Sequence, residues 1–201
     1  MAAISTLATL KTAILNWTKR SNLSAYLDEI IQMGEVYALR FVRSADMETS
    51  FSGSISSGTL AVPDSYLELK WAKIDGGSNA YLEMRPTQFI FQRYPVRSAS
   101  GPPKFIGRDG SVFQFGPFPD DSYSITGYYY KKPASILAGE TTFFLANPDL
   151  YLYCALCETE TFIKNDKRMD LWKAKRDQTI AAINGLMREG QYGDGMEIKV
   201  A

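Results

Sequence analysis

Two cysteines, Cys154 and Cys157, are the most reactive side chains of the chain and stand in a Cys-x-x-Cys pattern. This spacing serves thiol–disulfide exchange when a helix N-terminus lowers the pKa of the first thiol, and it serves zinc when further ligands are near. About two turns of predicted helix precede Cys154, so it lies away from a helix N-terminus. The chain has no other cysteine and no histidine, so one chain cannot complete a structural zinc site. We therefore expect two buried, inert core thiols.

The absence of histidine limits the catalytic chemistry further. Histidine-based acid–base catalysis and Ser-His or Cys-His nucleophilic pairs are excluded. The acid pairs Asp120–Asp121 and Glu158–Glu160 have the residue types of a glycosidase, but adjacent acids at turns and on helix faces are usually solvated. Residues 107–110, Gly-Arg-Asp-Gly, lack the spacing of a phosphate-binding loop and are typical of a turn. The sequence thus predicts no catalytic, cofactor-binding or metal-ligating residue.

Aromatic side chains gather in residues 113–133, FQFGPFPDDSYSITGYYYKKP. Tyrosines followed by Lys131 and Lys132 are the residue types that stack on and neutralise single-stranded nucleic acid. The 22 acidic and 22 basic residues cancel, however, which removes the overall positive field of a free-standing nucleic-acid binder. We expect a hairpin turned by the Gly-Pro-Phe-Pro corner, with Tyr128 and Tyr130 facing outward as candidates for subunit contacts.

Helices are predicted at both ends of the chain. Leu7, Leu10, Ile14 and Trp17 form an apolar stripe with helical spacing in residues 6–19, which Ser5 or Thr6 can cap. A similar stripe with charged flanks predicts the last helix over residues 167–188, and Gly190 is expected to end it.

One further helix is predicted next to each of these. Residues 24–43 carry an apolar face with Ser24 as the N-cap, and Gly34 within that face indicates close approach of another helix. Near the C-terminus, Asn147 as N-cap and Pro148 at the first helical position mark the start of the third helix. Short connections favour two antiparallel helical hairpins.

Between the helical ends, alternation of polar and apolar residues predicts strands. A half-polar pattern of this kind suits a small antiparallel sheet with one buried face. The expected elements are a strand at 66–74 that turns at 75–79 and returns, a short helix or turn at 85–95, two strands within 104–119 joined at 107–110, and a strand at 122–130.

The predicted fold class is therefore α+β: an α-helical bundle of two N-terminal and two C-terminal helices with an inserted small antiparallel β region and an extended C-terminal tail. The expected parts are an N-terminal helical hairpin (1–47), the β-rich region (48–135), a C-terminal helical hairpin (136–189) and the tail (190–201). The apolar runs are far too short to cross a bilayer, so we expect a soluble, intracellular protein without a membrane partner.

The tail has strand-like alternation but no local partner. In its last residues, MEIKVA, the side chains of Met196, Ile198 and Val200 would face one way in a strand. An extended segment of this kind can complete the sheet edge of another chain through main-chain hydrogen bonds. We expect these three residues, together with Tyr192, to bind a partner.

Four segments carry a family resemblance by their order and spacing. They are LAVPDSYLELKWAKID (60–75), LEMRPTQFIFQRYP (82–95), GPPKFIGRDGSVFQFGPFPDDSYSITGYYYKKP (101–133) and NPDLYLYCALCETETFIKNDKRMDLWKAKRDQTIAAIN (147–184). In this order they resemble head-to-tail adaptor, or connector, proteins of short-tailed bacteriophages and related phages. The first is close to the Leu-Pro-x-Asp-Tyr-Leu element of that family, with Val62 in place of the usual leucine.

The resemblance implies a structural virion protein, made in the host cytoplasm and located at the head–tail interface, with no enzymatic activity and no cofactor. It implies a homo-oligomeric ring, commonly a dodecamer, that docks under the portal protein and receives a tail or nozzle protein. Genomic DNA would pass through the ring without sequence-specific binding during packaging and ejection. We expect the helices to form the ring body and the β region to project toward the next tail component.

Two other function classes stay open at the level of the sequence. The tyrosine-rich strand with Tyr128 and Tyr130 is also the composition of an aromatic surface that binds carbohydrate or single-stranded nucleic acid. The acid pairs leave a tail-associated cell-wall hydrolase that uses carboxylates alone.

Overall fold

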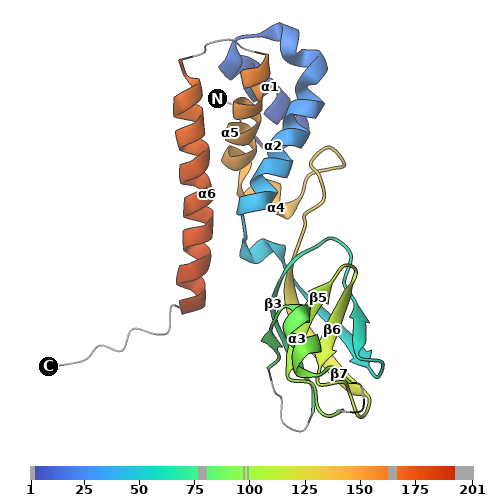
Figure 1. The fold of residues 1–201 in the computed structure, drawn as a ribbon. Coiled ribbons are helices and arrows are strands. Elements are labelled where there is room, and N and C mark those ends of the chain that lie inside the picture. Colours follow the sequence, from blue (N-terminus) through green and yellow to red (C-terminus); the bar gives the residue numbers. More distant parts are fainter. Residues whose placement is uncertain (1–2, 77–80, 97, 99, 163–166, 193–201) are drawn as a thin grey trace, which may run out of the picture. The chain divides into compact units, whose positions relative to one another are not determined.

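The computed structural model describes residues 3–76, 81–96, 98, 100–162 and 167–192, which form six α-helices and seven β-strands (Figure 1). The chain divides into two compact units. Unit 1 consists of Met1–Met47 and Pro133–Ala201, and unit 2 consists of Glu48–Lys132.

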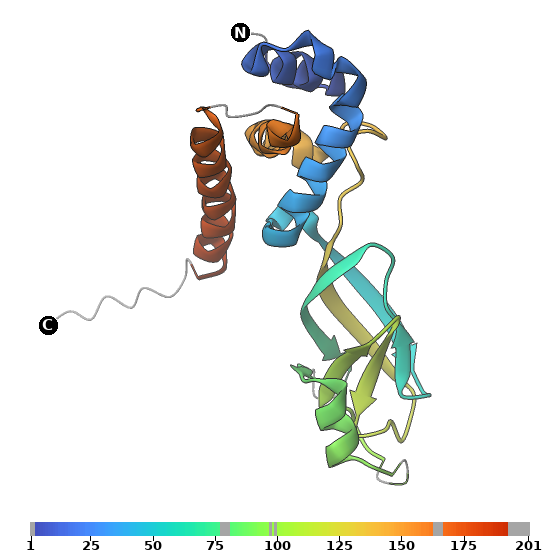
Figure 2. The same cartoon turned by 45° about the horizontal axis from the view of Figure 1, so that its top comes forward.

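Unit 1 is helical, and its central element is α5, of whose 11 residues seven are buried. Helix α5 packs against α1, α2 and α6, and it lies between α6 and α2 in both views (Figures 1 and 2). The helices of unit 1 are α1 (Leu7–Thr18), α2 (Leu27–Phe41), α4 (Thr142–Ala146), α5 (Pro148–Glu158) and α6 (Met169–Tyr192), with 3₁₀-helices at Ser21–Tyr26, Ala45–Met47 and Thr159–Thr161.

Helix α1 begins as the sequence predicts. The hydroxyl of Thr6 accepts a hydrogen bond from the backbone N–H of Thr9, and the Thr9 hydroxyl accepts one from the N–H of Thr6, which makes a capping box. Two members of the predicted stripe, Leu10 and Ile14, are fully buried. The third core position is Thr18, whose hydroxyl donates to the carbonyl of Ile14, so Trp17 lies half-buried at the side of the helix.

The second helix begins later than predicted, so Ser24 as its N-cap is wrong. Residues 21–26 form a 3₁₀-helix, and α2 starts at Leu27 with Asp28 and Glu29 in its first turn, where the helix dipole favours negative charge. The expectation of close helix packing at Gly34 is confirmed, because a methyl group there would lie 2.9 Å from the backbone nitrogen of Ala155 in α5.

Helix α5 begins at the predicted residues, but the side chain of Asn147 does not cap it as predicted. Pro148 occupies the first turn, and Asn147 is the N-cap residue without a capping hydrogen bond from its side chain. Its amide group donates instead to the carbonyl of Phe143 in α4, a short helix that the sequence pattern did not predict. Helix α6 continues through Gly190 to Tyr192, beyond the predicted end.

Unit 2 contains two sheets instead of one. The first has the strand order β1-β7-β3 and is antiparallel, and the second has the order β2-β6-β5-β4, in which β4 and β5 run parallel. The elements of unit 2 are β1 (Glu48–Ile55), β2 (Thr59–Ala61), β3 (Tyr66–Ile74), β4 (Glu83–Met84), α3 (Thr87–Arg93), β5 (Phe105–Asp109), β6 (Val112–Gly116) and β7 (Tyr123–Lys131).

Both sheets contribute side chains to one apolar core. Phe51 of β1 stacks on Phe113 of β6 with ring centroids 5.8 Å apart, and Ile106 and Ile125 are fully buried in the same cluster. Within the first sheet, Gly127 of β7 leaves room for the Phe51 ring of β1 and for the β3 backbone, since a methyl group there would lie 2.5 Å from Phe51 Cε1 and 2.6 Å from the carbonyl oxygen of Trp71. Each sheet therefore covers the apolar face of the other.

The prediction of a helical bundle with a small β insertion is wrong. The fold is mixed, with six helices and two sheets of seven strands in the described residues. Long strands such as β1 and β7 bury one apolar face, and a single small sheet would leave that face exposed to water. The second sheet removes it from water.

The predicted hairpin over residues 113–133 is also wrong. Strand β6 pairs with β2 and β5, whereas β7 pairs with β1 and β3, so the Gly-Pro-Phe-Pro corner leads the chain from one sheet to the other. By contrast, the two predicted strands within 104–119 do form a hairpin, β5 and β6, but its turn lies at Gly110–Ser111 and not at residues 107–110, because β5 continues to Asp109, which pairs with Val112.

Candidate functional site

The two thiols are buried core groups, as predicted. Cys154 and Cys157 are free cysteines within α5. Burial raises the pKa of the Cys154 thiol to about 12 and that of Cys157 to about 11. Thiols held protonated at neutral pH are poor nucleophiles and poor metal ligands.

The acid pairs have local partners. The Tyr123 hydroxyl donates to Asp120 at 2.6 Å, and this hydrogen bond raises the pKa of Tyr123 to about 12. Asp121 accepts from the backbone N–H of Ser122, and Glu160 forms an ion pair with Lys173. Among the described residues, no group of three or more acidic or cysteine side chains forms an arrangement that could hold a metal ion.

The two tyrosines predicted to contact a partner differ in exposure. Tyr128 of β7 is 38% exposed, as predicted. The prediction that Tyr130 faces outward is wrong, because Tyr130 is only 6% exposed, with its hydroxyl 3.4 Å from a carboxylate oxygen of Glu48. Tyr128 belongs to an exposed aromatic cluster on β3 and β7. Trp71 lies at its centre, with ring centroids 5.1 Å from Tyr128 and 5.8 Å from Tyr81. A partner-binding role for Tyr128 and Tyr130 stays a prediction.

The predicted tail residues lie at the limit of the structure. Tyr192 is the last residue of α6, and its side chain is not described. Met196, Ile198 and Val200 lie outside the described residues.

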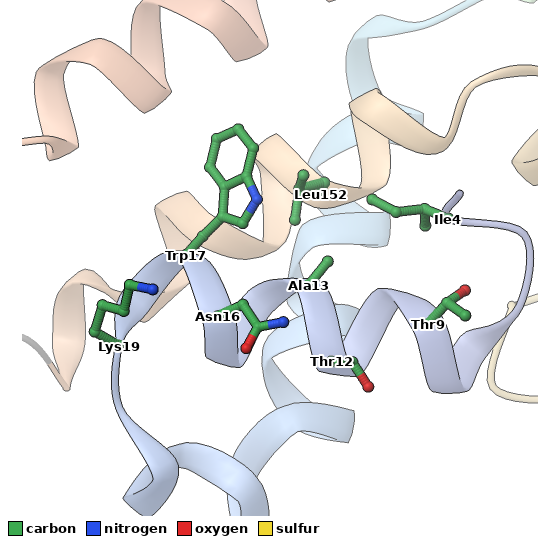
Figure 3. Close-up of a pocket in the computed structure, with 8 residues that line it drawn as sticks. All are labelled: Ile4, Thr9, Thr12, Ala13, Asn16, Trp17, Lys19 and Leu152. Atoms are coloured by element: carbon green, nitrogen blue, oxygen red, sulfur yellow. The ribbon is translucent and has the colours of Figure 1, made fainter. Parts of the chain in front are cut away.

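Unit 1 carries an open groove of about 440 Å³ along α1 that the sequence did not reveal. Figure 3 shows Ile4 at one end and Trp17 at the other, with Ala13 and Leu152 between them. The Trp17 ring is fixed by an edge contact with Tyr153, at 5.9 Å between centroids. We call this feature the α1 groove, and it is lined by Ile4, Thr9, Thr12, Ala13, Asn16, Trp17, Lys19 and Leu152.

The outer face of α6, turned away from α5, is the second surface that the sequence did not single out. Met169 and Trp172 are buried on the inner face, whereas Leu171 is 57% and Leu186 is 72% exposed. Helical periodicity places three alanines together with Lys175 and Gln178 between the two leucines. The outer face comprises Leu171, Ala174, Lys175, Gln178, Ala181, Ala182 and Leu186.

The signals for both surfaces are present in the sequence but weak. Trp17 was expected to lie in the core stripe of its helix, and its half-buried position follows only once Thr18 is known to occupy the core. The outer face of α6 has helical spacing, but alanines on an exposed face are also typical of a plain solvated helix. Within the described residues, no helix has both the length and the apolar composition to cross a lipid bilayer.

Comparison with known proteins agrees with the resemblance seen in the sequence. A search of the curated proteins found no match. The model of one family, SU10 adaptor protein, matches residues 5–196 and so covers both units and all described helices of the chain. This match confirms the predicted resemblance to phage head-to-tail adaptors and a structural role in the virion, with portal and tail proteins as its general partners. The chain belongs to the SU10 adaptor protein family.

Proposed function

We propose that the protein assembles as a ring, a dodecamer, which docks under the portal protein, extends the channel for genomic DNA and receives the tail. The observation that carries this proposal is the extent of the family match, residues 5–196. Because the match includes both units, we assign the adaptor role to the whole chain and not to one unit alone. The chain has zero net charge, which suits DNA that passes through without sequence-specific binding.

The distribution of exposed apolar side chains supports a ring. Ring contacts are heterologous, so each subunit must present two different patches. Unit 1 offers two in the α1 groove and the outer face of α6, and the helices of unit 1 form the ring body in this proposal. Unit 2 offers the cluster of Trp71, Tyr81 and Tyr128 for the next tail component. Rigid aromatic side chains are enriched at protein interfaces.

Electron microscopy of the protein mixed with its purified portal tests the proposal. We expect a ring with cyclic symmetry seated on the tail-facing side of the portal, and class averages of the portal alone serve as the control. We also expect the free protein to be monomeric and to form the ring only on the portal, which sedimentation velocity of the protein alone checks. Portals that stay bare at saturating protein concentrations would refute the docking role.

The tail contributes the second contact in this proposal. Its alternating residues Met196, Ile198 and Val200, with Tyr192, reach a neighbouring subunit or the portal and add a strand to a sheet edge. Deletion of residues 191–201 is expected to weaken attachment to portal particles. The triple substitution of Met196, Ile198 and Val200 by serine is a milder variant that keeps the length of the tail. Unchanged attachment of both variants would remove the tail from the interface.

The exposed aromatic cluster gives one second candidate function. Trp71, Tyr81 and Tyr128 present adjacent rings, which can stack on sugars or on unpaired bases. Binding of a glycan or of single-stranded DNA that Tyr128→Ala removes would support this candidate. Tyr130→Phe is a suitable control, because Tyr130 is buried and its ring does not belong to the cluster.

A further inference from the structure

We infer that the free edge of β1 in one subunit binds the tail of the adjacent subunit, whose residues 196–201 add a fourth, antiparallel strand to the first sheet. The inference rests on the proposed ring and names the sheet edge and the chain that the tail binds. It commits the tail to a second copy of this chain and not to the portal.

Strand β1 lies at one end of the first sheet and has a single neighbouring strand. Its eight residues, Glu48–Ile55, pair with β7 without interruption. In the described part of the chain, no backbone hydrogen bond joins these residues to any other segment. Figure 2 shows β1 in cyan at the rim of unit 2. The N–H and C=O groups that point away from β7 are therefore a template for a further strand.

The edge of β1 lacks the features that keep strand edges from pairing. Natural proteins usually protect an exposed edge by proline, lysine, a bulge or a short strand. Strand β1 has the sequence ETSFSGSI, which contains neither proline nor lysine, and its register with β7 has no shift. Its one charged side chain, Glu48, forms an ion pair with Lys70 at 2.7 Å. A long edge without protection indicates that another strand covers it in the assembled protein.

The other sheet edges are shorter or partly covered. Strand β2 has three residues and β4 has two. Strand β3 is as long as β7, but its pairing with β7 has two irregularities. The N–H of Leu82 donates to the carbonyl of Ala72 at 2.8 Å, and Lys73 forms a bridge with Tyr81, so part of the β3 edge is occupied. Among the described strands, β1 thus offers the longest regular edge.

The two faces of β1 define the side chains that a partner strand must carry. Phe51 and Ile55 are buried in the core, whereas Ser50, Ser52 and Ser54 are exposed. A strand that continues the sheet must therefore be apolar at alternate positions on the core side and polar on the other side.

The tail has this alternation. Met196, Ile198 and Val200 would face the core side of the sheet, and Glu197 and Lys199 would lie beside the serines of β1. Six residues in a strand span about 20 Å and form about six backbone hydrogen bonds with an antiparallel neighbour. The tail therefore matches β1 in pattern and in length.

One subunit has one tail and one β1 edge, which suits a ring. The two surfaces differ, so their contact is heterologous and repeats from subunit to subunit. A six-residue strand is a small interface, and it binds well only where another contact already holds the copies close together. The contact therefore forms on the portal and leaves the free chain monomeric, as the proposed function expects.

A synthetic peptide tests the edge without the ring. The peptide has residues 193–201 with Lys199→Cys and is mixed, at about 1 mM, with full-length chains that carry one added cysteine, with oxidised glutathione as the oxidant. Cross-strand neighbours on one face have Cβ atoms about 5 Å apart, so Ser50→Cys or Ser52→Cys should form the disulfide. The native Cys154 and Cys157 are buried with raised pKa values and stay unreactive at neutral pH.

Matched controls test the face, the place and the pattern. Thr49→Cys lies in the same strand on the opposite face, and Ser111→Cys is exposed elsewhere in unit 2. Both should give at least about fivefold less disulfide than Ser50→Cys or Ser52→Cys. A peptide in which Glu197 and Ile198 are exchanged keeps the composition but loses the alternation, and its yield should fall about tenfold. Thermal unfolding of each chain, followed by circular dichroism, shows that the fold is kept.

Mixed assembly on the portal tests which chain supplies the tail. Chains with Ser52→Cys alone and chains with Lys199→Cys alone are combined, assembled on the portal and oxidised, and the same is done with Ser50→Cys. We expect covalent dimers from one of these pairs and none from Ser111→Cys with Lys199→Cys. A single chain that carries both Ser52→Cys and Lys199→Cys, kept dilute without the portal, should form no internal disulfide.

The outcomes distinguish this inference from the proposed function. If rings form on the portal but no pair gives covalent dimers, the inference is refuted and the ring stands. An internal disulfide in the dilute double variant would show that the tail binds its own sheet, which also refutes the inference. Failure of the peptide to react at either serine refutes it without reference to the ring. If the peptide reacts at β1 but no ring forms, the proposed ring fails and the recognition of the tail by a second copy is supported.

Discussion

Replacement of Gly34 by alanine tests the close contact between α2 and α5. Gly34 is buried in α2, and an added methyl group would lie 2.9 Å from the backbone nitrogen of Ala155 and 3.1 Å from the carbonyl carbon of Cys154. Both are main-chain atoms in the middle of α5, which cannot rotate aside as a side chain can. The two helices must therefore move apart to accept the methyl group.

Two opposing effects set the size of the change. Alanine in place of glycine in a helix interior stabilises by about 1 kcal/mol through its higher helix propensity. Overpacking a well-packed contact costs about 1–3 kcal/mol. The second effect wins here because the nearest atoms belong to the backbone, and we expect Gly34→Ala to destabilise the chain by about 1 kcal/mol.

Gly185 offers a matched control in α6. It also lies inside a helix, but a methyl group there would meet nothing within 4 Å. Only the helix propensity then changes, so Gly185→Ala should stabilise the chain by about 1 kcal/mol. The pair therefore makes the same chemical change with opposite expected signs.

Thermal unfolding followed by far-ultraviolet circular dichroism measures both variants. For a chain of this size, 1 kcal/mol corresponds to a shift in Tm of about 2–4 °C. We expect Tm to fall for Gly34→Ala and to rise for Gly185→Ala. Equal stabilisation by both substitutions would show that α2 and α5 are not in the contact described, and would refute the reasoning.

Three further predictions concern buried groups. Burial holds the pKa of the Cys154 thiol at about 12, so the folded chain keeps this proton at pH 10.5, whereas the unfolded chain loses it above about pH 9. The free energy of unfolding is therefore unaffected by this thiol below about pH 9 and falls by about 2 kcal/mol at pH 10.5. Urea titrations should show a smaller alkaline loss of stability for Cys154→Ala, and an equal loss would contradict this. The Glu35 carboxylate accepts hydrogen bonds from the Ser135 hydroxyl and the Ile136 N–H. Glu35→Gln should therefore lower the free energy of unfolding in urea by about 1–3 kcal/mol. An unchanged urea midpoint would show that these hydrogen bonds do not stabilise unit 1. In unit 2, Gly127→Ala should cost about 1–3 kcal/mol, because its methyl group would meet the Phe51 ring and the Trp71 carbonyl of the neighbouring strands. A Tm at or above that of the wild type would contradict the close packing of β1 and β3 around Gly127.

Local features of the fold could be predicted because local chemistry determines them. The cap at Thr6 and the tight turn between β5 and β6 depend only on nearby side chains, and both are present in the structure, although the turn lies at Gly110–Ser111, later than predicted. Gly34 in the apolar face of α2 also predicts close helix packing from the sequence alone, because the backbone of another helix can approach where there is no side chain. These predictions needed no knowledge of distant residues.

The sheet arrangement depends on distant residues and could not be predicted in the same way. Strand β7 pairs with β1 along its whole length, from Glu48 opposite Tyr130 to Ile55 opposite Tyr123. The turn residues between β6 and β7 suggested a hairpin, but hydrogen bonds to β1 and β3 use both edges of β7. A strand with two long partners has no edge left for β6, and this competition is not visible in a local pattern.

The candidate site was only partly predictable for a related reason. Tyr128 stood out because aromatic clustering is visible in sequence, whereas its neighbours Trp71 and Tyr81 join it through strand pairing and a bridge between Lys73 and Tyr81. The α1 groove likewise needs Leu152 of α5, which no motif connects to α1. Surfaces built from several elements require the tertiary fold.

A net charge of zero can conceal charged surfaces that have a function. The 22 acidic and 22 basic residues cancel over the chain, which removes a general attraction to DNA. The cancellation is not uniform, because residues 1–27 contain Lys11, Lys19 and Arg20 without any acid, and residues 167–177 contain five basic residues against Asp170 and Asp177. Both segments are net basic although the chain as a whole is neutral. In the proposed ring, local surfaces of this kind would attract acidic patches of a partner, whereas the neutral chain as a whole would leave DNA free to move.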